Sequence, residues 1–190
     1  MRKNNVTGVI AQLLATLAVA TTALSSRAAD LSVCQFDGLV IRQVDKKHGG
    51  LTTREVITAA GAKTVNVLDG QRIIVNYPGG QVFANVKVEH SPRRSFDEDK
   101  RTILEQLELM ARNVPDGLTR SELQPFEVYS VNYGSAHAPL GMHTLFDDRH
   151  SLVVTAYLFP QEEPRMYAAP QEYEALRERF LKELAVCAAE

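Results

Sequence analysis

The residue types best suited to chemistry lie close together near residues 143–150, where two histidines stand among acidic side chains. His143, Asp147 and His150 offer imidazole and carboxylate groups, which suit zinc or manganese. A metal there would activate a bound water, so one hypothesis is a small metal-assisted hydrolase of the cell envelope. The alternative is a plain hairpin turn, because Asp147 and Asp148 can accept hydrogen bonds from their own backbone and no second motif supplies further ligands.

A second candidate is the acidic run Asp97-Glu98-Asp99, which could act as paired carboxylates or bind a cation. The run falls where a helix is expected to begin, and acidic groups in a first turn complement the helix dipole. We therefore interpret it as structural. The basic pair Arg93-Arg94, with Lys100 and Arg101 one turn further, could meet an anion or an acidic partner, although a solvated charged surface is the simpler interpretation.

Serine and histidine side chains give a third set of possibilities. His137 lies among small residues at 134–141, in a segment that could cover a ligand or be an ordinary connection. Ser135 or Ser151 could form a nucleophilic triad with a histidine and an aspartate, but the sequence contains no Gly-x-Ser-x-Gly elbow. It also contains no phosphate-binding glycine loop, nucleotide fingerprint or Cys-x-x-Cys motif. We therefore predict no catalytic residue and no cofactor.

The first 28 residues have the pattern of an export signal. Arg2 and Lys3 precede an uncharged, largely apolar run at 6–24, and Ser26-Arg27-Ala28 fits a cleavage site after Ala28, with the next residue as second choice. An uncleaved membrane anchor is the alternative, but the run contains several polar residues and is barely long enough to span. We expect an exported mature chain with no stable membrane span, periplasmic in preference to extracellular.

The mature chain is expected to be mildly acidic. The formal charge of the whole chain is −2, and cleavage removes three basic residues and no acidic one. No run rich in lysine and arginine is present, and nucleic-acid binding requires basic residues that neutralise phosphates. We therefore expect no nucleic-acid partner.

The chain has two cysteines, Cys34 near the predicted mature start and Cys187 near the end. Because exported proteins meet oxidising conditions, we predict that they form one disulfide that holds both ends of the domain. Three alternatives remain: two buried thiols, a redox pair, or a lipid-modified Cys34. The spacing is unlike that of a redox pair, and Val33 stands where a lipid-modification site needs a small residue.

The elements that must position these groups come in the order strands, helix, strands, helix. Runs rich in β-forming residues, separated by glycine-containing turns, predict strands at 39–44, 64–68, 72–77, 81–90, 126–133, 142–146 and 152–159. Asp69-Gly70 is a pair that favours tight turns, so we predict a hairpin between the second and third of these strands. Residues 147–150 predict another hairpin between the last two.

Two helices complete the predicted fold. Ser95 and Glu98 fit a capping box, and apolar residues then repeat at helical spacing as far as Pro115-Asp116-Gly117. A similar apolar stripe from Tyr173 to Cys187 predicts a C-terminal helix. This order predicts one α+β domain over residues 29–190, with an antiparallel sheet of about six strands and helices packed on it as in an α/β/α sandwich.

Two neighbouring segments carry a resemblance to a known family. Ile73-Ile74-Val75-Asn76-Tyr77-Pro78-Gly79-Gly80 is followed by Val82-Phe83-Ala84-Asn85-Val86-Lys87-Val88, then by a polar helix start, a late strand and a C-terminal helix. This arrangement, from residue 73 to the end, resembles the PsbP-like family of extrinsic photosystem II proteins, Ran-binding import factors and bacterial exported proteins. The resemblance implies a central antiparallel sheet between helices, and it assigns no functional residues.

These observations favour binding over catalysis. We predict a non-catalytic exported binding or accessory module of the bacterial cell envelope, which holds an envelope protein or a small ligand. The metal-assisted hydrolase using His143, Asp147 and His150 is the second hypothesis.

Overall fold

A computed structural model describes residues 29–47, 50–114, 116–135, 138–160 and 170–190. The predicted signal peptide and His137 therefore lie outside the described residues. The elements, in chain order, are η1 (Leu31–Val33), β1 (Val40–Lys47), β2 (Thr52–Thr58), β3 (Gly61–Val67), β4 (Asp69–Asn76), β5 (Val82–His90), α1 (Phe96–Ala111), β6 (Leu118–Leu123), β7 (Phe126–Ser135), β8 (Ala138–Asp147), β9 (Leu152–Leu158) and α2 (Pro170–Ala188).

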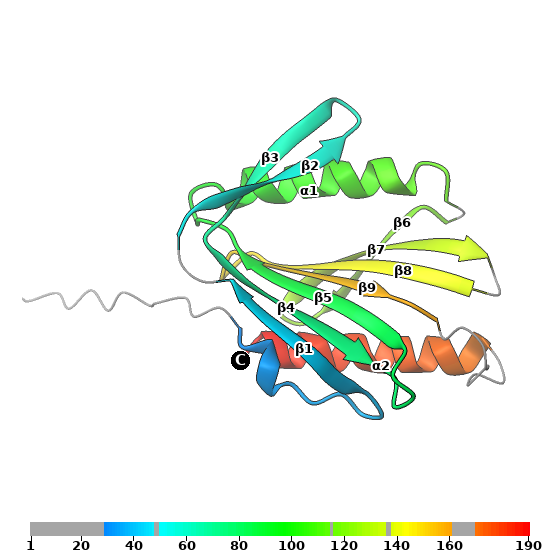
Figure 1. Ribbon diagram of the computed structural model, residues 1–190. Helices are drawn as coiled ribbons and strands as arrows, with labels where there is room; N and C mark the ends of the chain where they lie inside the picture. The colour runs from blue at the N-terminus through cyan, green and yellow to red at the C-terminus, as the bar shows by residue number, and fades with distance from the viewer. Residues whose placement is uncertain (1–28, 48–49, 115, 136–137, 161–169) are drawn as a thin grey trace, which may run out of the picture.

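The centre of the fold is a seven-stranded antiparallel sheet in the order β1-β4-β5-β9-β8-β7-β6. Helix α1 lies over one face of this sheet and α2 over the other (Figure 1). The two-stranded ribbon β2–β3 packs against α1 on the same side of the sheet. The predicted α+β class and its helix–sheet–helix layering are confirmed, and the ribbon is an additional element on the α1 side of the sheet.

Two strands were not expected from the sequence. In β2 the burial alternates only at its end, with Val56 and Thr58 buried, and in β6 no residue is fully buried. Strands of this kind carry polar residues on both faces, so they lack the apolar alternation that identifies a half-buried strand. The estimate of about six strands was therefore too low.

The predicted hairpin at Asp69-Gly70 is wrong. Strand β3 pairs with β2, whereas β4 pairs with β1 and β5, and both residues of the dipeptide lie inside β4, opposite His90 and Glu89 of β5. A Cβ added to Gly70 would lie 2.8 Å from the carbonyl oxygen of Val88. The glycine therefore permits a close approach between two backbones, which is another reason for glycine in a strand.

Gly70→Ala tests this explanation. Because the obstructing atom belongs to the backbone of β5, the strands must separate, and we expect a loss of about 1–3 kcal/mol in the free energy of unfolding. Urea denaturation followed by circular dichroism measures the loss. Gly79→Ala is the control, because a Cβ there would meet no atom within 4 Å. Equal stability of the two variants would contradict the close-approach explanation.

Apolar side chains form a separate core on each side of the sheet. On the α2 side, the Phe83 ring packs against Phe180 at a centroid distance of 5.1 Å, and Phe36 packs on Phe180 at 4.6 Å. On the other side, Phe96 and Leu107 of α1 are buried in one cluster with residues of the sheet and the ribbon. Both helices therefore follow from their apolar periodicity, as predicted.

The start of α1 differs in detail from the predicted capping box. Ser95 occupies the N-cap position, but its Oγ donates to the Pro92 carbonyl and to Asp99, and in the described chain it caps no helix N–H. Asp99 is 1 % exposed and accepts hydrogen bonds from the backbone N–H and the side-chain amide of Asn66. Asp99 thus attaches α1 to β3, which agrees with the structural interpretation of the acidic run.

The predicted disulfide between Cys34 and Cys187 is confirmed, with an S–S distance of 2.00 Å. It joins the segment after η1 to the last turn of α2, across 153 residues of sequence. The segment before it is also held in place, because Asp30 accepts hydrogen bonds from Gln71 and Lys46 and the Leu31 N–H donates to Gln71. Both ends of the described domain are therefore fixed to the sheet.

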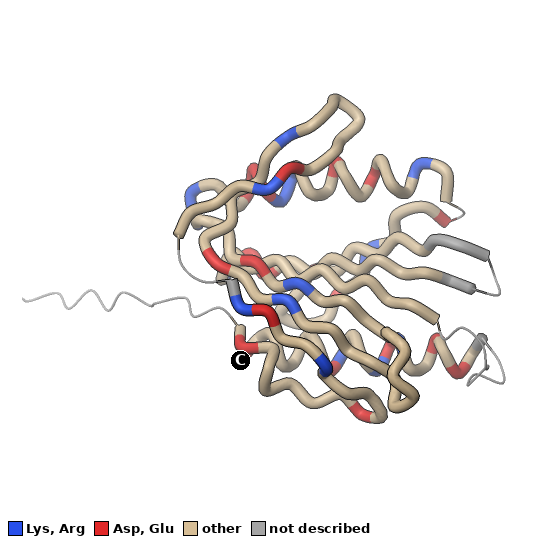
Figure 2. The backbone as a smooth tube through the Cα atoms, in the orientation of Figure 1, with Lys and Arg blue, Asp and Glu red and all other residues tan. Residues whose placement is uncertain are grey.

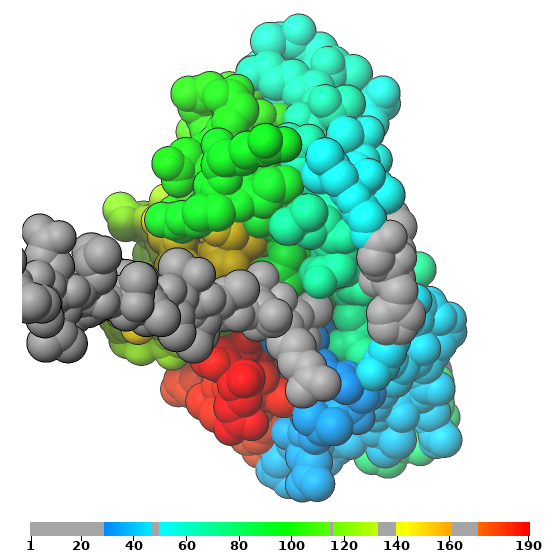
Figure 3. Space-filling view, turned by 90° about the vertical axis from the view of Figure 1, so that its left-hand side faces the viewer, coloured from blue at the N-terminus to red at the C-terminus, as the bar shows by residue number. Residues whose placement is uncertain are grey.

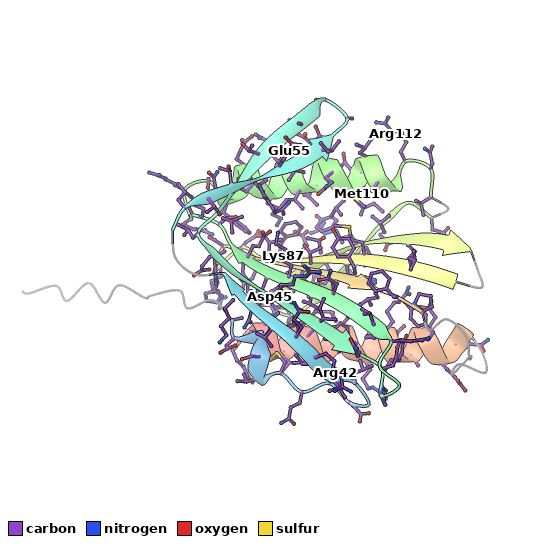
Figure 4. All side chains as sticks on the ribbon, in the orientation of Figure 1. Arg42, Asp45, Glu55, Lys87, Met110 and Arg112 are labelled. Atoms are coloured by element: carbon purple, nitrogen blue, oxygen red, sulfur yellow. A yellow bond between two sulfur atoms is a disulfide. The ribbon has the colours of Figure 1, made fainter. Side chains whose placement is uncertain are left out.

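Charged residues of both signs are interspersed along the sheet, the ribbon and both helices (Figure 2). The ribbon is attached to the sheet by one such pair, in which Arg54 Nε lies 2.8 Å from a carboxylate oxygen of the nearly buried Glu89. Lys87 contacts the same carboxylate and points from β5 toward the space below the ribbon (Figure 4). This mixed distribution is typical of a solvated surface.

Candidate functional site

A pocket of about 720 Å³ lies at the end of the molecule where α1 begins and α2 ends. Its wall comes from the end of β5, the approach to α1, the β8–β9 turn and the end of α2, with Ala29 and Leu68 completing it. Figure 3 faces this end of the molecule and shows the end of α2 (red) below α1 (green). The volume is within the range of small-molecule sites.

The β8–β9 turn contributes His150 and Asp147 to the pocket wall. Asp147 is 2 % exposed, and its Oδ1 accepts hydrogen bonds from the backbone N–H groups of Arg149 and His150 at 2.9 and 3.2 Å. Its Oδ2 lies 2.6 Å from His150 Nδ1. Asp147 therefore shapes the turn, as the turn interpretation predicted, and it also orients the His150 imidazole.

A second imidazole–carboxylate pair reaches the same pocket from β5. His90 lines the pocket, and its Nδ1 lies 2.9 Å from a carboxylate oxygen of Asp69, its partner in β4. Neither His90 nor His150 uses its Nε2 in a hydrogen bond with another described residue. An imidazole held at Nδ1 by a carboxylate presents Nε2 as an acceptor when neutral and as a donor when protonated.

Two arginines complete the polar part of the wall. Arg93 donates to the carbonyl oxygen of Asp148, and its Nη1 lies 3.5 Å from Ser151 Oγ. Ser151 has a φ of 56°, the left-handed conformation that closes the turn. Arg149 also lines the pocket and is exposed. The apolar lining comes from Leu68, Leu152 and the alanines near both ends of the domain.

The structure does not bring together the three residues of the metal hypothesis. His143 and Asp147 are four residues apart on β8, a separation of roughly 13 Å in a strand. Only Asp147 and His150 are in contact. Among the residues that the structure describes, no group of three or more histidine, cysteine or acidic side chains is arranged to hold a metal ion.

His143 belongs to a different polar cluster, on the face of the sheet that α2 covers. Its Nδ1 lies 2.7 Å from Ser130 Oγ, and its Nε2 is buried with no hydrogen-bond partner among the described residues. Burial, assisted by the positive charge of Arg177, lowers the pKa of His143 to about 3. Arg177 in turn donates to Asn132 at 3.0 Å. A base so weak is poorly matched to proton transfer near neutral pH.

Sequence reasoning missed this serine–histidine pair, because Ser130 and His143 are thirteen residues apart. They are directly opposite each other in the β7–β8 register, which also pairs Ser135 with Ala138. The sequence analysis interpreted residues 134–141 as a connecting segment, so it did not predict that β7 and β8 pair across a short turn. A Cβ on Gly141 would lie 2.7 Å from His143 Nε2, so the glycine makes room for the ring.

The other basic candidates near α1 are partly engaged in ion pairs. Lys100 lies 2.7 Å from both Glu127 and Asp148. Burial alone would lower the pKa of Lys100, but these two carboxylates outweigh it and raise the pKa. Arg101 pairs with Glu98 on the exposed face of the helix. Of the basic residues considered from the sequence, Arg93 is the one that lines the pocket.

No family model, curated protein or solved structure matches this chain. The resemblance to the PsbP-like family therefore stays a prediction. In the described part of the chain, no helix is both long enough and apolar enough to cross a membrane.

Proposed function

We propose that the domain is a non-catalytic binding or accessory module of the bacterial cell envelope, and that it holds a small ligand in the pocket between the β8–β9 turn and the end of α2. The observation that carries this proposal is the pocket itself, whose wall combines apolar residues with two arginines and two imidazoles. Ligand sites commonly combine an apolar lining with a few polar groups that fix orientation.

Export to the periplasm is part of the same proposal. The Cys34–Cys187 disulfide supports it, because structural disulfides persist in oxidising compartments. Membership of the PsbP-like family is also proposed, and it is supported by the antiparallel sheet between two helices that the resemblance implies.

Native mass spectrometry of protein purified gently from its own envelope fraction tests the proposal. We expect the mass of residues 29–190 less two hydrogens, with an additional small-molecule mass. The paired variants are Leu68→Trp, which narrows the pocket, and Leu51→Trp, which changes another exposed leucine that does not line it. The bound mass should disappear in the first variant and remain in the second.

Two outcomes would count against the pocket. The same bound mass in both variants would place the ligand elsewhere. A stoichiometric protein partner bound without a small molecule would indicate that the domain functions through a protein interface.

A further inference from the structure

The charges around the pocket indicate the chemistry of its ligand; this inference rests on the proposed function. Arg149 lines the pocket and forms no side-chain hydrogen bond or ion pair with another described residue. Arg93 uses one nitrogen on the Asp148 carbonyl and Ser151, so its remaining N–H donors are available. A guanidinium binds carboxylates and phosphates through paired N–H donors.

Most acidic side chains near these arginines are already engaged. Asp147 is buried against His150 and the turn backbone, and Asp148 pairs with Lys100. Glu190, at the end of α2, is the other acidic residue that lines the pocket, and no ion pair joins it to Arg93 or Arg149 among the described residues. The two arginines therefore leave positive charge available on the side of the β8–β9 turn.

Part of the wall is apolar. Leu68 and Leu152 line the pocket, together with alanines near both ends of the domain. A ligand that fills this space should carry a small apolar body beside its charged group, because burial of apolar surface adds to affinity.

We infer that the pocket binds a small organic acid. Its carboxylate or phosphate group lies against Arg149 and Arg93, and its apolar body contacts Leu68 and Leu152. The shared chemistry is a compact anionic group on an apolar body.

Calorimetric titration of the purified domain with three probes tests this inference. Benzoate and phenyl phosphate carry the two acid groups on the same ring, and benzamide is the neutral counterpart of benzoate. We expect at least one acid to bind and benzamide to bind at least about tenfold more weakly, because charge-assisted hydrogen bonds are lost. The preferred acid distinguishes a carboxylate from a phosphate ligand.

Arg149→Gln should weaken binding of the preferred acid by about tenfold or more. Arg42→Gln is the control, since Arg42 is exposed on β1, away from the pocket (Figure 4), and should change the affinity by less than about twofold. Equal binding of benzamide and benzoate, or full affinity in Arg149→Gln, would overturn the inference. Failure of both acids to bind, while native mass spectrometry still shows a ligand that depends on the pocket, would reject the organic-acid ligand and leave the proposed binding pocket supported.

Discussion

Removing the disulfide should lower the free energy of unfolding by roughly 3–5 kcal/mol. The bond closes a loop of 153 residues, and in the chain-entropy account the gain grows with loop length because the open unfolded chain has more conformations to lose. Domains of this size have total stabilities of about 5–15 kcal/mol. The loss would therefore remove a large part of the stability.

Urea denaturation of the Cys34→Ala/Cys187→Ala protein measures this loss. Alanine is the replacement of choice because Cys34 is 7 % exposed, and a serine hydroxyl there would add a cost of its own. The Cys187→Ala single variant should lose as much as the double variant, since either change opens the loop. A loss below about 1 kcal/mol would show that the packing around Phe36 and Phe180 alone holds the ends together.

Acid should destabilise the domain through His143, by several kcal/mol between pH 6.5 and pH 3. The pKa of His143 is about 3 in the folded protein, first because of burial and then because of Arg177, and 6.5 is its ordinary value. Between these values the unfolded chain binds a proton at this histidine and the folded chain does not. Stability therefore falls as pH decreases through this window, by about 1.4 kcal/mol per pH unit, and the loss levels off below pH 3.

The comparison of His143→Asn with the unchanged protein isolates this contribution. Stability is measured by urea denaturation at several pH values from 6.5 to 4.5. This range lies above the ordinary pKa values of most carboxyl groups. His143→Asn should remove most of the slope that the unchanged protein shows over this range. An unchanged slope in His143→Asn would mean that other groups cause the acid sensitivity.

Local signals in the sequence were sufficient for several elements. The apolar stripes predicted both helices, and the positions of two cysteines near the ends predicted the disulfide, because each of these inferences depends on neighbouring residues or on a single possible pairing. The turn at 147–150 also followed from local chemistry, since Asp147 accepts hydrogen bonds from the turn backbone.

The sequence-based predictions failed where a local cause and a long-range cause produce the same residue pattern. Asp-Gly suits a tight turn, but Gly70 is required by the proximity of Val88 on another strand. Most residues of strands β2 and β6 are exposed and polar. These strands therefore lack the alternation of apolar and polar residues by which a strand is predicted. Sequence reasoning could not assemble the pocket either, because Leu68, His90 and the β8–β9 turn meet only through sheet pairing.

The position of the pocket has a practical consequence for handling the protein. Ala29 and Glu190 both line it, so a tag fused to either position would begin at the mouth of the proposed site. Such a tag could compete with a ligand and make a binding protein look inactive. The turn between β4 and β5 is a better place for an insertion, because Gly79 is exposed and an added Cβ there meets no atom within 4 Å.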